Sequence, residues 1–139
     1  MAQINAYLHF NGNCREAMAF YKECLGGELT MQAVGESPMA GQMPSEMHKN
    51  ILHAQLVKDG FVLLASDMMG PEVASKGSTI SLLLDCSSEE EIKTLFSNLS
   101  SGGEIGHPLK EEFWGATFGD LTDKFGINWL FNFDKNQKA

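Results

Sequence analysis

Leu25-Gly26-Gly27-Glu28-Leu29, in the first half of the chain, returns in the second half as Ser101-Gly102-Gly103-Glu104-Ile105. Each Gly-Gly pair follows a segment with apolar residues at helical spacing and precedes a segment of extended character. Helix C-termini favour glycine because it adopts the left-handed backbone conformation without strain. The stretch therefore marks a helix end in each half and predicts an internal duplication.

The segments on either side of the two Gly-Gly pairs follow one order. The first half predicts a strand at residues 3–10, a helix at 14–25 and strands at 28–34, 50–58 and 61–66. The second half predicts a strand at 78–85, a helix at 89–99 and strands at 104–109, 113–118 and 127–133. Capping boxes are expected at the two helix starts, from Asn13 with Glu16 and from Ser88 with Glu91.

We therefore predict an α+β fold made of two βαβββ modules within a single domain. Module one covers about residues 1–68 and module two about residues 77–134, with a tail at 135–139. One helix covers only one face of a four-stranded sheet, so the other face must find a different cover. Two such sheets that face one another would leave a concave pocket between them.

The composition excludes several classes of function. The chain has 139 residues and a formal net charge of -8, and its ten basic residues are scattered, so nucleic-acid binding is not expected. No apolar run approaches the roughly 20 residues of a membrane-spanning helix, and no signal peptide is recognisable at the N-terminus. Three cysteines without a CxxC spacing argue against disulfides and structural zinc. We expect a cytoplasmic protein that binds neither nucleic acid nor membranes.

Two longer motifs resemble a known family. The first is Tyr7-Leu8-His9-Phe10-Asn11-Gly12-Asn13 with the later Ala17-x-x-Phe20-Tyr21-x-x-x-Leu25-Gly26-Gly27, and the second is Phe113-Trp114-Gly115 with Asp123-Lys124-Phe125-Gly126-x-x-Trp129. Together they resemble the PhnB-like branch of the vicinal oxygen chelate superfamily, also called glyoxalase/bleomycin-resistance or demethylubiquinone-methyltransferase-like. Lys124 stands where the family pattern has proline. The resemblance implies two βαβββ modules that enclose an open-sheet cavity, in a homodimer.

Metal-dependent members of that superfamily hold a divalent ion with four His or Glu side chains from the first and last strands of each module. Counting from the shared landmarks places these positions on residues that are poor ligands or none: Ala6, Leu63 or Leu64, Thr79, and Trp129 or Leu130. Ligand type largely decides metal binding. We therefore predict a pocket without metal ligands and without a cofactor, and a small molecule as the binding partner.

Six residues are predicted to line the pocket: Leu8, Phe10, His53, Thr79, Ser81 and Trp114. His53 is the candidate catalytic residue because histidine titrates near neutral pH, although a half-buried strand histidine with a purely structural role fits the pattern as well. Trp114 suits either an aromatic pocket wall or a dimer contact.

Two other functions fit the sequence. The chain could be a lyase, isomerase or dioxygenase that binds a divalent metal ion through an atypical set such as His9, His53 and Asp67. It could also be a non-catalytic interaction module whose cavity is filled. The metal content of the purified protein distinguishes the metal-dependent enzyme from the metal-free prediction. A ligand screen distinguishes the interaction module from a small-molecule-binding protein, because a ligand of the folded state raises its melting temperature.

Overall fold

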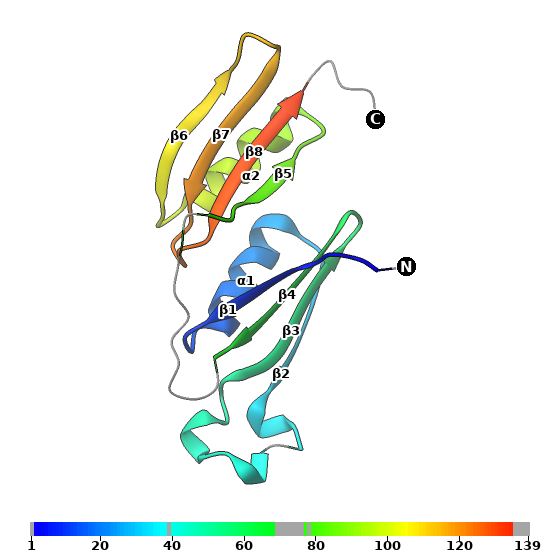
Figure 1. Cartoon of the computed structure of the whole chain (residues 1–139), viewed down its shortest axis with the longest axis vertical. Helices are drawn as coiled ribbons and strands as arrows, with labels where there is room; N and C mark the ends of the chain where they lie inside the picture. The colour runs from blue at the N-terminus through cyan, green and yellow to red at the C-terminus, as the bar shows by residue number, and fades with distance from the viewer. Residues whose placement is uncertain (1, 39, 69–76, 78, 135–139) are drawn as a thin grey trace. The chain divides into compact units, whose positions relative to one another are not determined.

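The structure is a computed structural model that describes residues 2–38, 40–68, 77 and 79–134. The chain divides into two compact units, Met1–Ser75 and Lys76–Ala139 (Figure 1). Each unit holds one four-stranded sheet and one α-helix of twelve residues. No helix within the described residues is long and apolar enough to span a membrane.

In the first unit, the elements are β1 (Ala6–Phe10), α1 (Cys14–Leu25), β2 (Glu28–Ala33), β3 (Ile51–Lys58) and β4 (Phe61–Asp67). The strand order is β1-β4-β3-β2, with β1 parallel to β4 and the other pairs antiparallel. Three short 3-10 turns lie between β2 and β3: η1 (Val34–Glu36), η2 (Ala40–Gln42) and η3 (Ser45–Met47). The second unit contains β5 (Leu82–Asp85), α2 (Glu89–Ser100), β6 (Glu104–Glu111), β7 (Ala116–Thr122) and β8 (Asn128–Asp134), in the order β5-β8-β7-β6.

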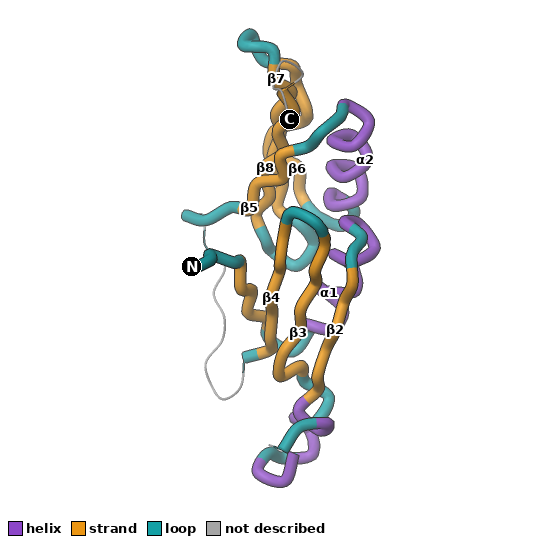
Figure 2. The backbone as a smooth tube through the Cα atoms, turned by 90° about the vertical axis from the view of Figure 1, so that its right-hand side faces the viewer, coloured by secondary structure: helices purple, strands orange, loops and turns teal. Residues whose placement is uncertain are grey.

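Each helix packs on one face of the sheet in its own unit (Figure 2). In the first unit, Phe10, Ala54 and Ala65 are fully buried on that face beneath the apolar side of α1, on which Met18 and Tyr21 are also fully buried. In the second unit the core is made of side chains from α2, β7 and β8, and its members include Ile92, Phe96, Leu99, Leu121, Trp129 and Phe131. We call the other side of each sheet, which its own helix does not cover, the open face.

The repeated Gly-Gly stretch is explained by close backbone packing as well as by helix termination. Gly26 and Gly102, directly after or close to the helix ends, have φ of 79° and 76°. A Cβ atom on Gly27 would lie 2.7 Å from the carbonyl oxygen of Val57, and one on Gly103 would clash in the same way with the carbonyl of Thr122. The second glycine of each pair therefore lets the chain pass against a neighbouring strand end, at the same place in both units.

The predicted α+β fold with two βαβββ modules is confirmed, and the differences lie at element ends. The strand predicted at 113–118 begins at Ala116, because Gly115 has φ of 93° and its N–H donates to the carbonyl of Glu112, which closes a turn there. The strand predicted at 78–85 begins at Leu82. Ile51 is fully buried with Ala54, although simple alternation groups it with exposed His53, because the register of β2 and β3 shifts between Gln32 and Ala33.

The two predicted capping boxes have different outcomes. Ser88 caps α2 as expected, since its hydroxyl accepts the N–H of Glu91 at 3.0 Å, while the Glu91 carboxylate accepts the N–H of Ser87 at 2.8 Å. Asn13 occupies the N-cap position of α1, but its side chain makes no capping hydrogen bond. The carboxylate of Asp67 accepts the N–H of Cys14 in its place, from 53 residues beyond Cys14 along the chain.

Candidate functional site

The open face of the first sheet carries one polar side chain from each strand at the same level. His9 of β1 pairs with Ser66 of β4, and His53 of β3 pairs with Gln32 of β2. The antiparallel register of β3 and β4, in which Ala54 pairs with Ala65, places His53 beside Ser66. We call these four residues the polar row.

The side chains of the polar row have no hydrogen-bond partner in the part of the chain that the structure describes. His9, His53 and Gln32 are exposed and Ser66 is half-buried. Adjacent strands lie about 4.8 Å apart, so the Cα atoms of His9 and His53, with one strand between them, are about 10 Å apart. The row therefore offers hydroxyl, amide and imidazole groups whose hydrogen bonds are left to water or to a ligand.

An aromatic ring lies beside the polar row. Tyr7 is 43% exposed, and its ring centroid lies 5.1 Å from that of His9 with an interplanar angle of 34°. At the next level of the open face, Tyr7 pairs with Leu64, Leu64 with Gln55 and Gln55 with Thr30, so that level is apolar on β1 and β4 and polar on β3 and β2. Sequence reasoning missed Tyr7, Ser66 and Gln32, because only the strand register shows which residues of separate strands share a level.

The structure does not bring all of the predicted lining residues to one face. Leu8 pairs with Ala65 and Phe10 pairs with Asp67, so both point to the side of the sheet that α1 covers, and Phe10 is fully buried. His53 lies on the open face, opposite its buried neighbour Ala54. The cause is the alternation of β1, which gives its apolar side to the helix and leaves Tyr7 and His9 on the other side.

The remaining predicted lining residues belong to the second unit. Thr79 and Ser81 are exposed and precede β5, in a segment fixed by Asn128, whose side-chain amide donates to the carbonyls of Gly77 and Ile80 at 2.8 and 3.3 Å. Trp114 is 54% exposed in the turn between β6 and β7, where its ring makes a T-shaped contact with Phe113 at 4.9 Å. Their role as pocket residues stays a prediction.

Asp67 has a structural role that removes it from the alternative metal set. It is 3% exposed, and its Oδ1 accepts the N–H groups of Gly12 and Cys14 at 2.9 Å each, while its Oδ2 accepts the N–H of Ile51 at 2.8 Å. Asp67 therefore caps α1 from a distance of 53 residues along the chain and ties it to the start of β3. Its carboxylate lies on the helix-covered side, so it does not join His9 and His53, and the proposed set of these three ligands is wrong.

Three of the four positions counted as metal-ligand sites lie in strands and carry apolar side chains, and the fourth, Thr79, precedes β5. Ala6 pairs with Leu63 and Leu82 pairs with Trp129, and all four lie on the helix-covered sides. One residue further along, the open faces carry the pairs Tyr7–Leu64 and Leu83–Leu130. Among the described residues, no three His, Cys, Asp or Glu side chains come together in a way that could hold a metal ion.

The open face of the second sheet also carries polar side chains, but they pair with one another. The Asn132 amide donates to Asp85 Oδ1 at 2.9 Å, Thr122 donates to Asn128 Oδ1 at 2.9 Å, and His107 Nδ1 lies 2.7 Å from Asp120 Oδ2. Below this face, Asp123 is 3% exposed and accepts the N–H groups of Phe125 and Ile127 and the indole N–H of Trp129. The polar side chains named here are thus satisfied internally, whereas Glu104 and Lys110 at the β6 edge of this face are exposed.

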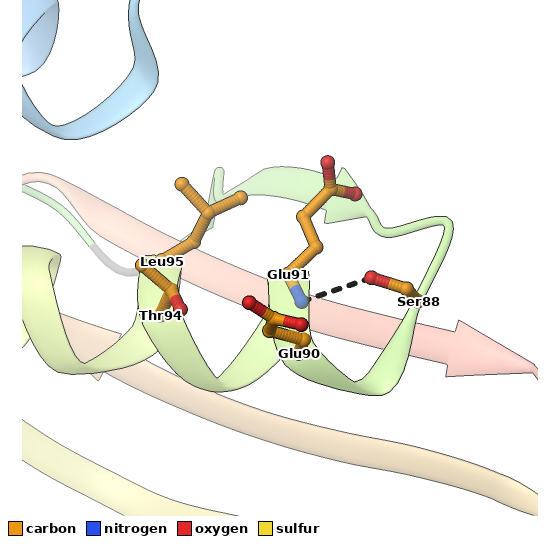
Figure 3. Close-up of a pocket in the computed structure, with 5 residues that line it drawn as sticks. All are labelled: Ser88, Glu90, Glu91, Thr94 and Leu95. Carbon is orange, nitrogen blue, oxygen red and sulfur yellow. Dashed lines mark hydrogen bonds between the residues drawn. The ribbon is translucent and has the colours of Figure 1, made fainter.

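A depression of about 280 Å³ lies at the start of α2, lined by Ser88, Glu90, Glu91, Thr94 and Leu95. Figure 3 shows the capping bond from the Glu91 N–H to the Ser88 hydroxyl within it. The negative charges of Glu90 and Glu91 near this helix N-terminus interact favourably with the helix dipole and stabilise α2. None of the predicted site residues lies in this depression, so it is a surface feature of the cap rather than the predicted site.

Two cysteines are held in an unreactive form. Burial, with the nearby charge of Asp67, raises the pKa of the Cys14 thiol to about 12. Burial, with Glu91 and Asp85, raises the pKa of the Cys86 thiol to about 11. Since the thiolate is the nucleophile, these environments fit packing residues rather than catalytic ones.

Comparison with known proteins gives one consistent result. Residues 2–131 match the family model described as 3-demethylubiquinone-9 3-methyltransferase. Protein YjdN of Escherichia coli strain K12 is 38% identical over 143 residues, which cover 96% of this chain and 97% of that protein.

Solved structures agree. Protein PA1353 from Pseudomonas aeruginosa is 40% identical, with a TM-score of 0.86 over 96% of this chain and 98% of that one. The PhnB protein from Bacillus cereus, described as a putative 3-demethylubiquinone-9 3-methyltransferase, is 27% identical, with a TM-score of 0.78 over 95% of this chain and 99% of that one. Glyoxalase/bleomycin resistance/dioxygenase proteins share the fold at 13% and 20% identity. The chain therefore belongs to the PhnB-like, 3-demethylubiquinone-9 3-methyltransferase-like family, and it shares its fold with glyoxalase/bleomycin resistance/dioxygenase proteins.

Proposed function

We propose that this chain binds a small organic molecule and does so without the four-ligand metal site of metal-dependent glyoxalase-like proteins. The observation that carries the proposal is the composition of the open faces beside the counted ligand positions Ala6, Leu63 or Leu64, and Trp129 or Leu130. Tyr7–Leu64 in one sheet and Leu83–Leu130 in the other present an aromatic ring and three leucines there. Such side chains suit the apolar part of an organic ligand, whereas a divalent ion requires oxygen, nitrogen or thiolate donors.

The unpartnered polar row supports binding on the first sheet in particular. Ligand sites combine apolar contacts with a few polar groups that fix the ligand's orientation. His53, the predicted catalytic candidate, is one of those polar groups, and its role in this proposal is to contact the ligand.

Metal analysis and a thermal-shift screen test the proposal together. Protein purified without a metal-chelating column is expected to contain far less than one equivalent of any transition metal, and EDTA is expected to leave its melting temperature unchanged. A panel of aromatic acids, phenols and apolar amines is expected to include compounds that raise the melting temperature, since a ligand of the folded state stabilises it. A stoichiometric metal that EDTA removes would favour the metal-dependent enzyme. No response to any compound would favour the interaction module.

We also propose that the protein is a homodimer in the cytoplasm. Phe113 is 97% exposed and Trp114 is 54% exposed, and an aromatic pair of this kind suits a subunit contact. Three cysteines outside disulfides suit a reducing compartment. Light scattering during size-exclusion chromatography is expected to give twice the chain mass of 15.3 kDa, and Phe113→Ser is expected to shift the protein towards the monomer.

A further inference from the structure

We propose that the polar row recognises a planar organic anion whose acidic groups reach His9 at one end and His53 at the other. This inference rests on the proposed small-molecule function and adds the class of ligand. The site is the open face of the first sheet, where β1, β4, β3 and β2 contribute one polar side chain each at a single level.

The spacing of the donors sets the size of the ligand. The two imidazoles stand on strands about 10 Å apart, with the Ser66 hydroxyl on the strand between them. An aromatic ring with an acidic group at each end can bridge this distance when the side chains of His9 and His53 lean towards it. Ser66 and Gln32 can then add hydrogen bonds to the same acidic groups.

The charges on this face favour an anion. Apart from the histidines, the described strand residues of the open face include one charged side chain, that of Glu28. Glu28 pairs with Val57 and lies four residues along β2 from Gln32. Four residues of strand correspond to about 13 Å, so Glu28 stands well apart from the row. The Lys58 ammonium group donates to the carbonyl of Leu25 and points elsewhere. Among the described strand residues of this face, protonated histidines are therefore the only source of positive charge, and they form strong charge-assisted hydrogen bonds to carboxylates.

The surroundings of the row favour a flat ligand. Tyr7 and His9 place their rings at 5.1 Å with a tilt of 34°, which extends an aromatic surface along β1. Leu64 lies beside Tyr7 on β4 and adds an apolar contact between the two histidine-bearing strands. A planar ring gains offset stacking and apolar contact here, while a branched aliphatic acid gains only the latter.

Isothermal titration of the full-length protein with terephthalate and with naphthalene-2,6-dicarboxylate tests the inference. We expect at least one of them to bind at pH 6 and to bind about tenfold more weakly at pH 8, because histidine loses its charge in that interval. Terephthalamide, which has the same shape without charge, is expected to bind at least tenfold more weakly at pH 6. His9→Gln and His53→Gln are each expected to weaken binding of the dicarboxylate about tenfold and to flatten its pH dependence.

His107→Gln is the matched control, because His107 is an exposed strand histidine of the second sheet whose ring is already paired with Asp120. It is expected to change the affinity less than twofold. Circular dichroism of each variant checks that the fold is retained. If neither dicarboxylate binds, or if both bind equally well to the His9 and His53 variants, this ligand class is wrong. The small-molecule function survives that result if other compounds of the thermal-shift panel still bind, and it fails separately if none does.

Discussion

The two units repeat one plan, yet their sheets satisfy polar groups in opposite ways. On the open face of the second sheet, Asp85 with Asn132, Asn128 with Thr122 and His107 with Asp120 form hydrogen bonds among themselves. On the open face of the first sheet, the polar row leaves its hydrogen-bonding groups without a partner among the described residues. A face with paired groups gains little from a polar ligand, whereas a face with unpaired groups gains new hydrogen bonds. The duplicated units thus differ in whether the central polar side chains of the open face are paired, and our proposal places ligand recognition on the sheet where they are not.

The buried aspartates differ in a related way. Asp123 serves its own turn, since Phe125, Ile127 and Trp129, which donate to its carboxylate, lie within six residues along the chain. Asp67 joins the start of α1 and the start of β3 to the end of β4, across 53 and 16 residues. The first unit therefore depends on a long-range polar contact where the second depends on local ones.

The largest effect is expected from removing these two carboxylates. Asp67→Ala leaves three N–H groups without their acceptor, and unsatisfied buried donors cost about 1–3 kcal/mol each. Since the Gly12 N–H is only partly buried, the free energy of unfolding should fall by about 3–5 kcal/mol, in the lower part of the summed range. Asp123→Ala should cost about 2–3 kcal/mol, because the indole N–H of Trp129 loses a buried acceptor while the N–H groups of Phe125 and Ile127 lie nearer to water. Urea denaturation followed by circular dichroism measures both, and Asp67→Asn, which keeps one acceptor oxygen, should lie between wild type and Asp67→Ala. A smaller loss for Asp67→Ala than for Asp123→Ala would reverse the comparison.

The thiols of the two units should also differ in reactivity. A raised thiol pKa lowers the thiolate fraction at every pH below it, so the folded protein protects Cys14 and Cys86 from alkylation at pH 8. We expect iodoacetamide to modify Cys14 at least about a hundredfold more slowly in the folded than in the urea-unfolded chain, and Cys86 more quickly than Cys14. Mass spectrometry of digested samples gives both rates. Rapid modification of Cys14 in the folded protein would contradict its assigned surroundings.

The smallest effect separates the two helix caps. Ser88→Ala removes the bond from the Glu91 N–H and should cost about 1 kcal/mol, whereas Asn13→Ala should cost close to nothing, because the Asn13 side chain makes no capping bond. The same urea experiment measures both variants. Equal losses at the two sites would mean that Asn13 caps α1 after all.

Sequence reasoning predicted the features that depend on neighbours along the chain. The βαβββ order, both helices and the Ser88 cap follow from periodicity, glycine pairs and turn residues that lie within a few positions of one another. Gly27 and Gly103 were informative for the same reason, since their effect on the backbone is local even though each also packs against a distant strand.

Contacts between distant segments could not be read in the same way. Nothing near Asn13 shows that Asp67 takes over its capping role, because that contact spans more than 50 residues. The polar row depends on the register of three strand pairs, and an error of one residue moves a side chain to the opposite face. Phe10 and His53 were predicted to line one pocket, but they lie on opposite faces of the sheet. The metal set of His9, His53 and Asp67 is wrong for the same reason, because Asp67 lies on the helix-covered side.

The most direct test of the central claim is to map a bound ligand onto the two sheets. Uniformly 15N-labelled full-length protein, titrated with whichever dicarboxylate or thermal-shift compound binds, should show its largest amide shift changes at His9, Ser66, His53 and Gln32. The amides of Asn132, Asp120 and Thr122 should change little, and prior treatment with EDTA should alter neither the affinity nor the pattern. Changes centred on the paired residues of the second sheet, or binding that EDTA abolishes, would contradict the account.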